Sequence, residues 1–203
     1  MSAAMTEANV GRIHDLATRY ELSYVACWAL CGRGWVRARR GQAERAMADL
    51  ITGNEGIRRI GVKVYSPHSL ALLVEAAIGL GQLDQAERAL DQAFEVCRAR
   101  VDASNEPELL CLRGHLILGR DRSAHAAARA AFTEALVIAQ RDGAHGQALR
   151  AATDLAALLR DDHRPDEAIA VLGPVYRGFA PDLDDPSFAN ARRLLAQLSP
   201  DAG

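Results

Sequence analysis

The sequence is poor in aromatic residues and has no long apolar run. Aromatic residues make up 5% of the 203 residues, so alanine, leucine and valine have to fill the core, which suits closely packed helices. No uncharged apolar stretch is long enough to span a membrane. The first 15 residues lack the basic start and apolar run of a signal peptide. We therefore expect a soluble, cytoplasmic protein with no membrane partner.

An excess of positive charge is also missing. The formal net charge is −2, which argues against a nucleic-acid binder, because such proteins usually carry a strong positive excess. Lys63 is the only lysine, so arginine supplies nearly all the positive charge. This bias is typical of a GC-rich genome, while single arginines remain candidates for binding carboxylates or phosphates. We expect no nucleic-acid partner.

Motifs that carry catalytic or metal chemistry are absent from the sequence. There is no G-x-x-x-x-G-K-[ST] phosphate loop, no H-E-x-x-H zinc motif and no G-x-S-x-G nucleophile turn. Cys27 and Cys31 are four residues apart, but no nearby His or Cys completes a four-ligand site. The aspartates of residues 181–186 lack the EF-hand spacing. We expect no enzyme activity, no catalytic residue, no cofactor and no metal.

What the sequence does contain is an internal repeat. A polar turn is followed about five residues later by alanine, and four residues further on by a large apolar residue. The pattern occurs four times, with the alanines at Ala46, Ala86, Ala128 and Ala168, so that the spacings are 40, 42 and 40 residues. A nearly fixed period of this length is the signature of a helical repeat protein.

Each repeat is predicted to be two antiparallel helices. The segment before each turn is apolar and has a small residue near its middle, such as Gly34, Gly114 or Ala156, which allows close approach of the second helix. The short turn forces the antiparallel arrangement. We expect one domain over residues 1–203, and its parts are an N-terminal helix (1–20), four repeats (22–61, 66–101, 105–142 and 145–178) and a capping helix (186–199).

The N-terminal segment has its own interpretation. It looks like the second helix of an upstream unit whose first helix is absent, so the chain is expected to be the end of a longer solenoid or a short gene derived from one. A solenoid end without a cap exposes an apolar edge. We therefore also consider a homodimer formed through this end.

These features resemble the tetratricopeptide repeat (TPR) family. Gly41, Ala46 and Leu50 fit its motif in the first repeat, and Gly81, Ala86 and Leu90 fit it in the second. The family's usual period is 34 residues, and this one is about six residues longer. The resemblance implies an all-α, right-handed superhelical solenoid of about four helical hairpins, with an N-terminal helix and a C-terminal capping helix.

A narrower resemblance covers most of the chain and is densest from about residue 105 onward. The segments EPELLCLRGHLILG, residues 131–179 and FANARRLLAQL are similar to the C-terminal repeat region of large bacterial signalling proteins. In those proteins, an adenylate/guanylate cyclase or a transcriptional-activator domain is joined to a signal-transduction ATPase. No cyclase or ATPase motif is present in this sequence. The resemblance therefore implies a sensor or scaffold part.

In the TPR family, the first helix of each hairpin lines the concave surface that receives a partner. By this register, the expected groove residues are Trp28, Trp35, Arg39, His68, Glu75, Glu108, His115, Arg150, Thr153 and Arg160, with Cys31, Ala71, Ile78, Cys111, Leu118 and Ala157 at further register positions. Exposed tryptophan and arginine are enriched in interface hot spots. The alternative for both tryptophans is packing at the end of the array, particularly against the N-terminal helix.

Residues 149–172 read as helix, turn, helix, and this raises a DNA-binding alternative. That alternative fails because the second helix starts with acidic residues and lacks base-reading side chains. We expect a non-catalytic scaffold that binds a protein or peptide, in bacterial signalling or transcription regulation. The alternative is an effector-sensing module that binds a small ligand or a partner ATPase.

Overall fold

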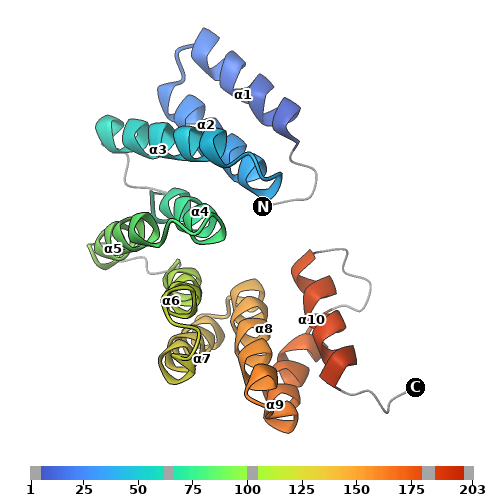
Figure 1. The fold of residues 1–203 in the computed structure, drawn as a ribbon. Helices are drawn as coiled ribbons and strands as arrows, with labels where there is room; N and C mark the ends of the chain where they lie inside the picture. Colours follow the sequence, from blue (N-terminus) through green and yellow to red (C-terminus); the bar gives the residue numbers. More distant parts are fainter. Residues whose placement is uncertain (1–5, 62–65, 100–104, 180–185, 199–203) are drawn as a thin grey trace. The chain divides into compact units, whose positions relative to one another are not determined.

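The structure is a computed structural model, and it describes residues 6–61, 66–99, 105–179 and 186–198. These residues contain ten α-helices and no strand, so the expected all-α architecture is confirmed (Figure 1). The helices are α1 (Glu7–Arg19), α2 (Ser23–Arg39), α3 (Ala43–Ile60), α4 (Ser66–Gly79), α5 (Leu83–Arg98), α6 (Glu106–Arg120), α7 (His125–Arg141), α8 (His145–Asp161), α9 (Pro165–Arg177) and α10 (Pro186–Leu198).

The chain divides into two compact units, residues 1–105 and residues 106–203, which we call unit 1 and unit 2. In unit 1, α2 packs against α3 and α4 packs against α5, while α1 packs against α2. In unit 2, α6 pairs with α7 and α8 pairs with α9, and α10 packs against both α8 and α9. The single domain and the repeat boundaries expected from the sequence stay predictions.

A few expected segments reach beyond the described residues. These are residues 1–5 of the N-terminal helix, residues 100–101 of the second repeat, residues 180–185 of the loop before α10, and residue 199 of the capping helix. Within the described residues, Gly41 and Gly81 end the turns after α2 and α4 with φ of 73° and 71°. His163 takes the same place after α8 with φ of 60°, a conformation that favours glycine.

Small residues hold the two helices of a hairpin together. The four repeat alanines, Ala46, Ala86, Ala128 and Ala168, are all 0% exposed. A Cβ atom on Gly34 would lie 2.8 Å from the carbonyl oxygen of Ala46, which is too close for any side chain. A Cβ atom on Gly114 would lie 2.3 Å from the ring of Phe132. The close approach expected at Gly34 and Gly114 is confirmed.

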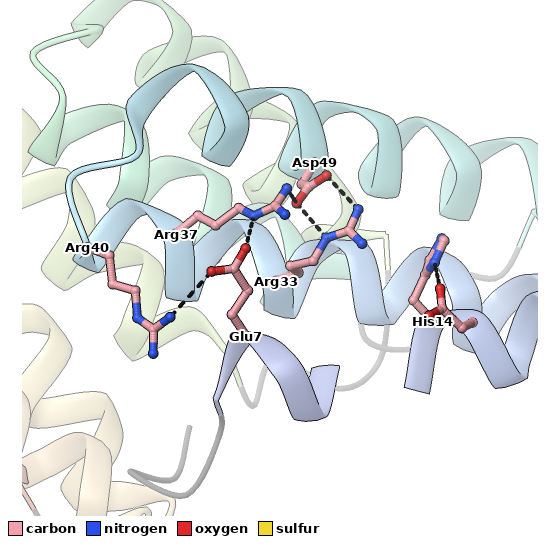
Figure 2. A network of polar contacts seen from close by, with 7 residues as sticks. Glu7, His14, Arg33, Arg37, Arg40 and Asp49 are labelled. Carbon is pink, nitrogen blue, oxygen red and sulfur yellow. Dashed lines mark hydrogen bonds and ion pairs between the residues drawn. The ribbon is translucent and has the colours of Figure 1, made fainter. Parts of the chain in front are cut away.

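A buried ion-pair network fastens α1 to α2 and α3 (Figure 2). Asp49 of α3 is 8% exposed and accepts hydrogen bonds from Arg33 at 2.8 and 2.9 Å and from Arg37 at 2.7 Å. Arg37 also donates to Glu7 at 2.7 Å, and Arg40 donates to Glu7 at 3.3 Å. The Arg37 hydrogen bond lowers the pKa of Glu7, and the Asp49 hydrogen bond raises the pKa of Arg33. Because Arg37 of α2 bonds both Asp49 of α3 and Glu7 of α1, the network holds the three helices in register.

Candidate functional site

Five of the expected groove residues gather on one face of unit 1, which we call the tryptophan face (Trp28, Trp35, Arg39, His68 and Glu75). All five come from the first helices of consecutive hairpins, α2 and α4, and the two helices are in contact. The rings of Trp28 and His68 are 5.6 Å apart between centroids and tilted by 43°. The Trp28 ring therefore contacts α4.

The second half of the tryptophan face combines an aromatic ring with both signs of charge. Trp35 Nε1 donates to Glu75 Oε2 at 3.2 Å, and the Arg39 guanidinium lies 4.9 Å from the centre of the Trp35 indole. Arg39 Nη1 is 3.9 Å from Glu75 Oε1. The Arg39 side chain is 61% exposed and that of Glu75 36%, so the group is accessible to a partner.

The unit 2 face, which we call the ion-pair face (Glu108, His115, Arg150 and Asp154), comes from α6 and α8. Arg150 Nη1 donates to Glu108 Oε1 at 3.3 Å, with the two side chains 32% and 15% exposed. His115 Nε2 lies 3.0 Å from Asp154 Oδ2, and the His115 ring meets the Phe132 ring at 5.2 Å. The sequence reasoning missed Asp154, although its spacing of four from Arg150 places both on one helix face.

The contacts on both faces join equivalent positions of consecutive repeats. Trp28 and His68 are 40 residues apart, as are Trp35 and Glu75, and Glu108 and Arg150 are 42 residues apart. The first two separations equal the 40 residues between Ala46 and Ala86, and the third equals the 42 residues between Gly114 and Ala156, the small residues of the same two first helices. The repeat therefore positions the two partners of each pair side by side, whatever their chemistry.

Two expected groove residues do not join these clusters. Thr153 Oγ1 donates to the carbonyl oxygen of Leu149 in its own helix at 2.7 Å. Arg160 bonds Asp161 at 2.8 Å and donates to Gln197 of α10 at 3.1 Å. Arg160 therefore links α8 to α10.

Three of the further positions expected to line the groove are buried instead of exposed. Cys31 is 0% exposed, and Ala71 and Cys111 are each 1% exposed, so no partner can touch them. Burial raises the pKa of the Cys31 and Cys111 thiols to about 12. Although Cys111 lies close to Asp154, its thiol stays protonated at neutral pH and is not a nucleophile. These side chains form the floor beneath the two faces.

A groove of about 770 Å³ lies between α3 and α5, the second helices of the two hairpins of unit 1, and residues of α4 form its floor. Its apolar surface includes Ile51, Leu70, Leu73, Ala89 and Val96, and its charged edge includes Glu55, Arg58, Arg88 and Glu95. The sequence reasoning missed this groove because it considered only first helices as a binding surface.

The described part of the chain lacks two kinds of feature. None of the helices there combines the length and apolarity needed to cross a membrane. No three of its His, Cys, Asp and Glu side chains are gathered in a way that could hold a metal ion.

The comparisons with known proteins concern the fold. No family model matches the sequence, and no curated protein matches it. The crystal structure of BtubC (BKLC) from P. vanneervenii is similar, with a TM-score of 0.71, 13% identity, and coverage of 96% of this chain and 82% of that chain. A putative kinesin light chain with TPR-like repeats from Podosopora anserina has a TM-score of 0.55 and 19% identity, and the match covers 96% of this chain and 87% of that chain. The fold is a TPR-like helical repeat. The helical repeat that the sequence period predicts is confirmed.

Proposed function

We propose that this protein is a non-catalytic interaction module that binds a protein or peptide partner on the tryptophan face and the ion-pair face. One observation carries the proposal: repeat-equivalent side chains of consecutive first helices meet and leave tryptophan and arginine partly exposed. These are the side chains most enriched in binding hot spots. The TPR-like fold supports the same function.

The two faces offer different chemistry to a partner. The tryptophan face presents indole surface with the exposed Arg39 guanidinium over it, which suits an apolar side chain followed by a carboxylate. The ion-pair face presents Glu108 and Arg150, which pair with each other. A partner can replace this pairing only if it offers a positive charge to Glu108 and a negative charge to Arg150. We infer that the tryptophan face supplies most of the binding free energy.

The biological setting that we propose is bacterial signalling or transcription regulation. It rests on the sequence resemblance to the repeat region of cyclase–ATPase and activator proteins. A second copy of the chain is the other partner that we propose, and it would bind at the N-terminal end rather than at these two faces.

The two tryptophans of the chain are both on the tryptophan face, so intrinsic fluorescence reports on that face alone. Proteins captured from a bacterial lysate by the wild-type chain would be compared with those captured by Arg39→Glu. Arg45→Glu is the matched control, because it makes the same charge change at an exposed position of α3. We expect Arg39→Glu to lose a partner that Arg45→Glu retains.

A captured partner, once purified, should shift the tryptophan emission of the wild-type chain. Its affinity for Trp35→Phe should be lower, since the variant keeps a ring but loses the indole N–H that meets Glu75. Equal capture by all variants, or binding with unchanged emission, would show that the tryptophan face is not the binding surface.

The groove between α3 and α5 favours a second candidate function, the sensing of a small effector. Its volume of about 770 Å³ falls within the range of small-molecule sites, and an apolar floor with a few charged edge residues is their usual lining. A ligand that binds there raises the melting temperature by mass action. A metabolite panel should contain a compound that stabilises the wild-type chain but not Arg88→Ala; a panel without any stabilising compound argues against this function.

A further inference from the structure

The outward side of α1 carries an exposed apolar stripe. Ile13, Leu16 and Tyr20 are 49%, 50% and 65% exposed, and their spacing of three and four residues places them on one side of the helix. Leu22 and Val25, at the start of α2, are 53% and 38% exposed. Of the seven large apolar side chains exposed in the described residues, five thus fall within residues 13–25. A concentration of this kind marks an interaction surface.

The packing of α1 explains why the stripe is uncovered. The helices α3 and α7 each pack against two neighbours, α3 against α2 and α4, and α7 against α6 and α8. Among the described helices, α1 packs against α2 alone, using Val10 and Ala17, which are 1% and 3% exposed (Figure 1). The network around Glu7 fixes α1 in this orientation, so the stripe is held outward rather than folded away (Figure 2).

The charges beside the stripe select an occupant. Arg12, Asp15, Arg19 and Glu21 are all exposed and alternate in sign along the chain. When two such helices run antiparallel about an axis between Leu16 and Ala17, Asp15 of each copy faces Arg19 of the other. Glu21 follows the end of α1 with a φ of 56°, so this helical register does not include it. The Asp15 side chain is 82% exposed beside His14, so a second copy can reach it.

We propose that this face binds a second copy of the chain, with the two α1 helices antiparallel across a two-fold axis. In this register, Ile13 faces Tyr20 of the second copy, and the two Leu16 side chains meet near the axis. The interface is isologous, which is the commonest symmetry of homo-oligomers. It rests on the homodimer named in the proposed function, but it uses none of the residues of the tryptophan face or the ion-pair face, so it can fail while the binding of a protein or peptide partner there holds.

Sedimentation equilibrium of the 203-residue chain tests the dimer. We expect a monomer–dimer equilibrium for the wild type, and a dissociation constant more than about a hundredfold higher for Leu16→Asp and Tyr20→Asp, since each buries an unpaired charge in the interface. Val137→Asp is the matched control, because Val137 is 58% exposed on α7 and should leave the dimer intact. Circular dichroism verifies that each variant is folded. A wild type that stays monomeric at every concentration, or Leu16→Asp that dimerises like the wild type, overturns the proposal.

Cysteine cross-linking tests the antiparallel arrangement. Leu16→Cys should form a disulfide-linked dimer by itself, and a mixture of Ile13→Cys with Tyr20→Cys should form a mixed dimer, whereas Ile13→Cys alone should not exceed the wild-type background. Efficient linking of Ile13→Cys to itself would show a parallel pair and contradict the proposal. The charges give a second readout: Arg19→Glu should raise the dimer dissociation constant by a factor of roughly five, and Arg19→Glu with Asp15→Arg should restore it. A double variant that is no tighter than Arg19→Glu counts against the register.

Discussion

The two units build the same contact from different side chains. Trp28, His68, Glu108 and Arg150 occupy equivalent positions of four consecutive repeats, at spacings of 40, 40 and 42 residues. In unit 1 the pair is two aromatic rings, and in unit 2 it is a carboxylate and a guanidinium. The repeat geometry thus determines which positions meet, while the residue types determine whether the contact is dispersive or ionic. One scaffold can therefore carry two kinds of binding surface.

The largest expected difference between the units concerns their buried ion pairs. Asp49→Ala in unit 1 should lower the free energy of unfolding by about 3 kcal/mol, because it leaves two partly buried guanidinium groups without their carboxylate. Glu108→Ala in unit 2 should cost only about 1 kcal/mol, since the Arg150 side chain that Glu108 pairs with is 32% exposed and retains more contact with water. Urea denaturation followed by tryptophan emission reports on unit 1, and far-ultraviolet circular dichroism reports on both units. Equal losses in the two variants would contradict this comparison.

The glycine contacts should differ next most strongly. A Cβ atom on Gly53 would lie 2.7 Å from the carbonyl oxygen of Cys27, whereas one on Gly114 would meet only the Phe132 ring. Backbone atoms cannot move aside as a ring can, so Gly53→Ala should cost about 2 kcal/mol and Gly114→Ala about 1 kcal/mol. Urea denaturation measures both. Adding Phe132→Leu should reduce the loss of stability that Gly114→Ala causes, because it removes the ring that the new methyl group meets. If the loss is not reduced, backbone atoms of α7 must also clash with the methyl group.

Added salt should weaken the coupling of the ionic pair but not that of the aromatic pair. A double-mutant cycle between Glu108 and Arg150 should give a coupling energy of about 1 kcal/mol that falls as sodium chloride is added, because ions screen partly exposed charges. The same cycle between Trp28 and His68 should change little with salt at a pH where histidine is neutral, because ring contacts depend on dispersion. The same salt dependence in both cycles would remove the distinction between the two faces.

The smallest expected effect is an opposite dependence on pH. The hydrogen bond to Asp162 raises the pKa of His125 in unit 2, so the stability it contributes is full below the ordinary value of 6.5 and is lost as the pH rises through the raised value. The Arg37 hydrogen bond lowers the pKa of Glu7 in unit 1, so that contribution is present above 4.5 and is lost as the pH falls through the lowered value. Melting temperatures should therefore differ between wild type and His125→Gln mainly at acidic pH, and between wild type and Glu7→Gln mainly at neutral pH. Differences that do not vary with pH would assign both residues a purely steric role.

The sequence is sufficient to predict the helical hairpins and the residues along their contacts. The alanine period of about 40 residues appears directly in the chain, and Gly34 and Gly114 mark where helices approach closely, because only a missing side chain permits that distance. The same register places Trp28 opposite His68 and Glu108 opposite Arg150. Local periodicity determines these features, so a single sequence reveals them.

Burial and long-range pairing were decided only by the tertiary structure. Cys31 and Cys111 share the register of the surface residues, yet neighbouring helices cover them completely. The bonds from Asp49 to Arg33 and Arg37 and the link from Arg160 to Gln197 join segments whose separation follows no repeat rule. A periodic pattern states which side of a helix is apolar, but the twist and spacing of the neighbouring helices determine which side chains remain in contact with solvent.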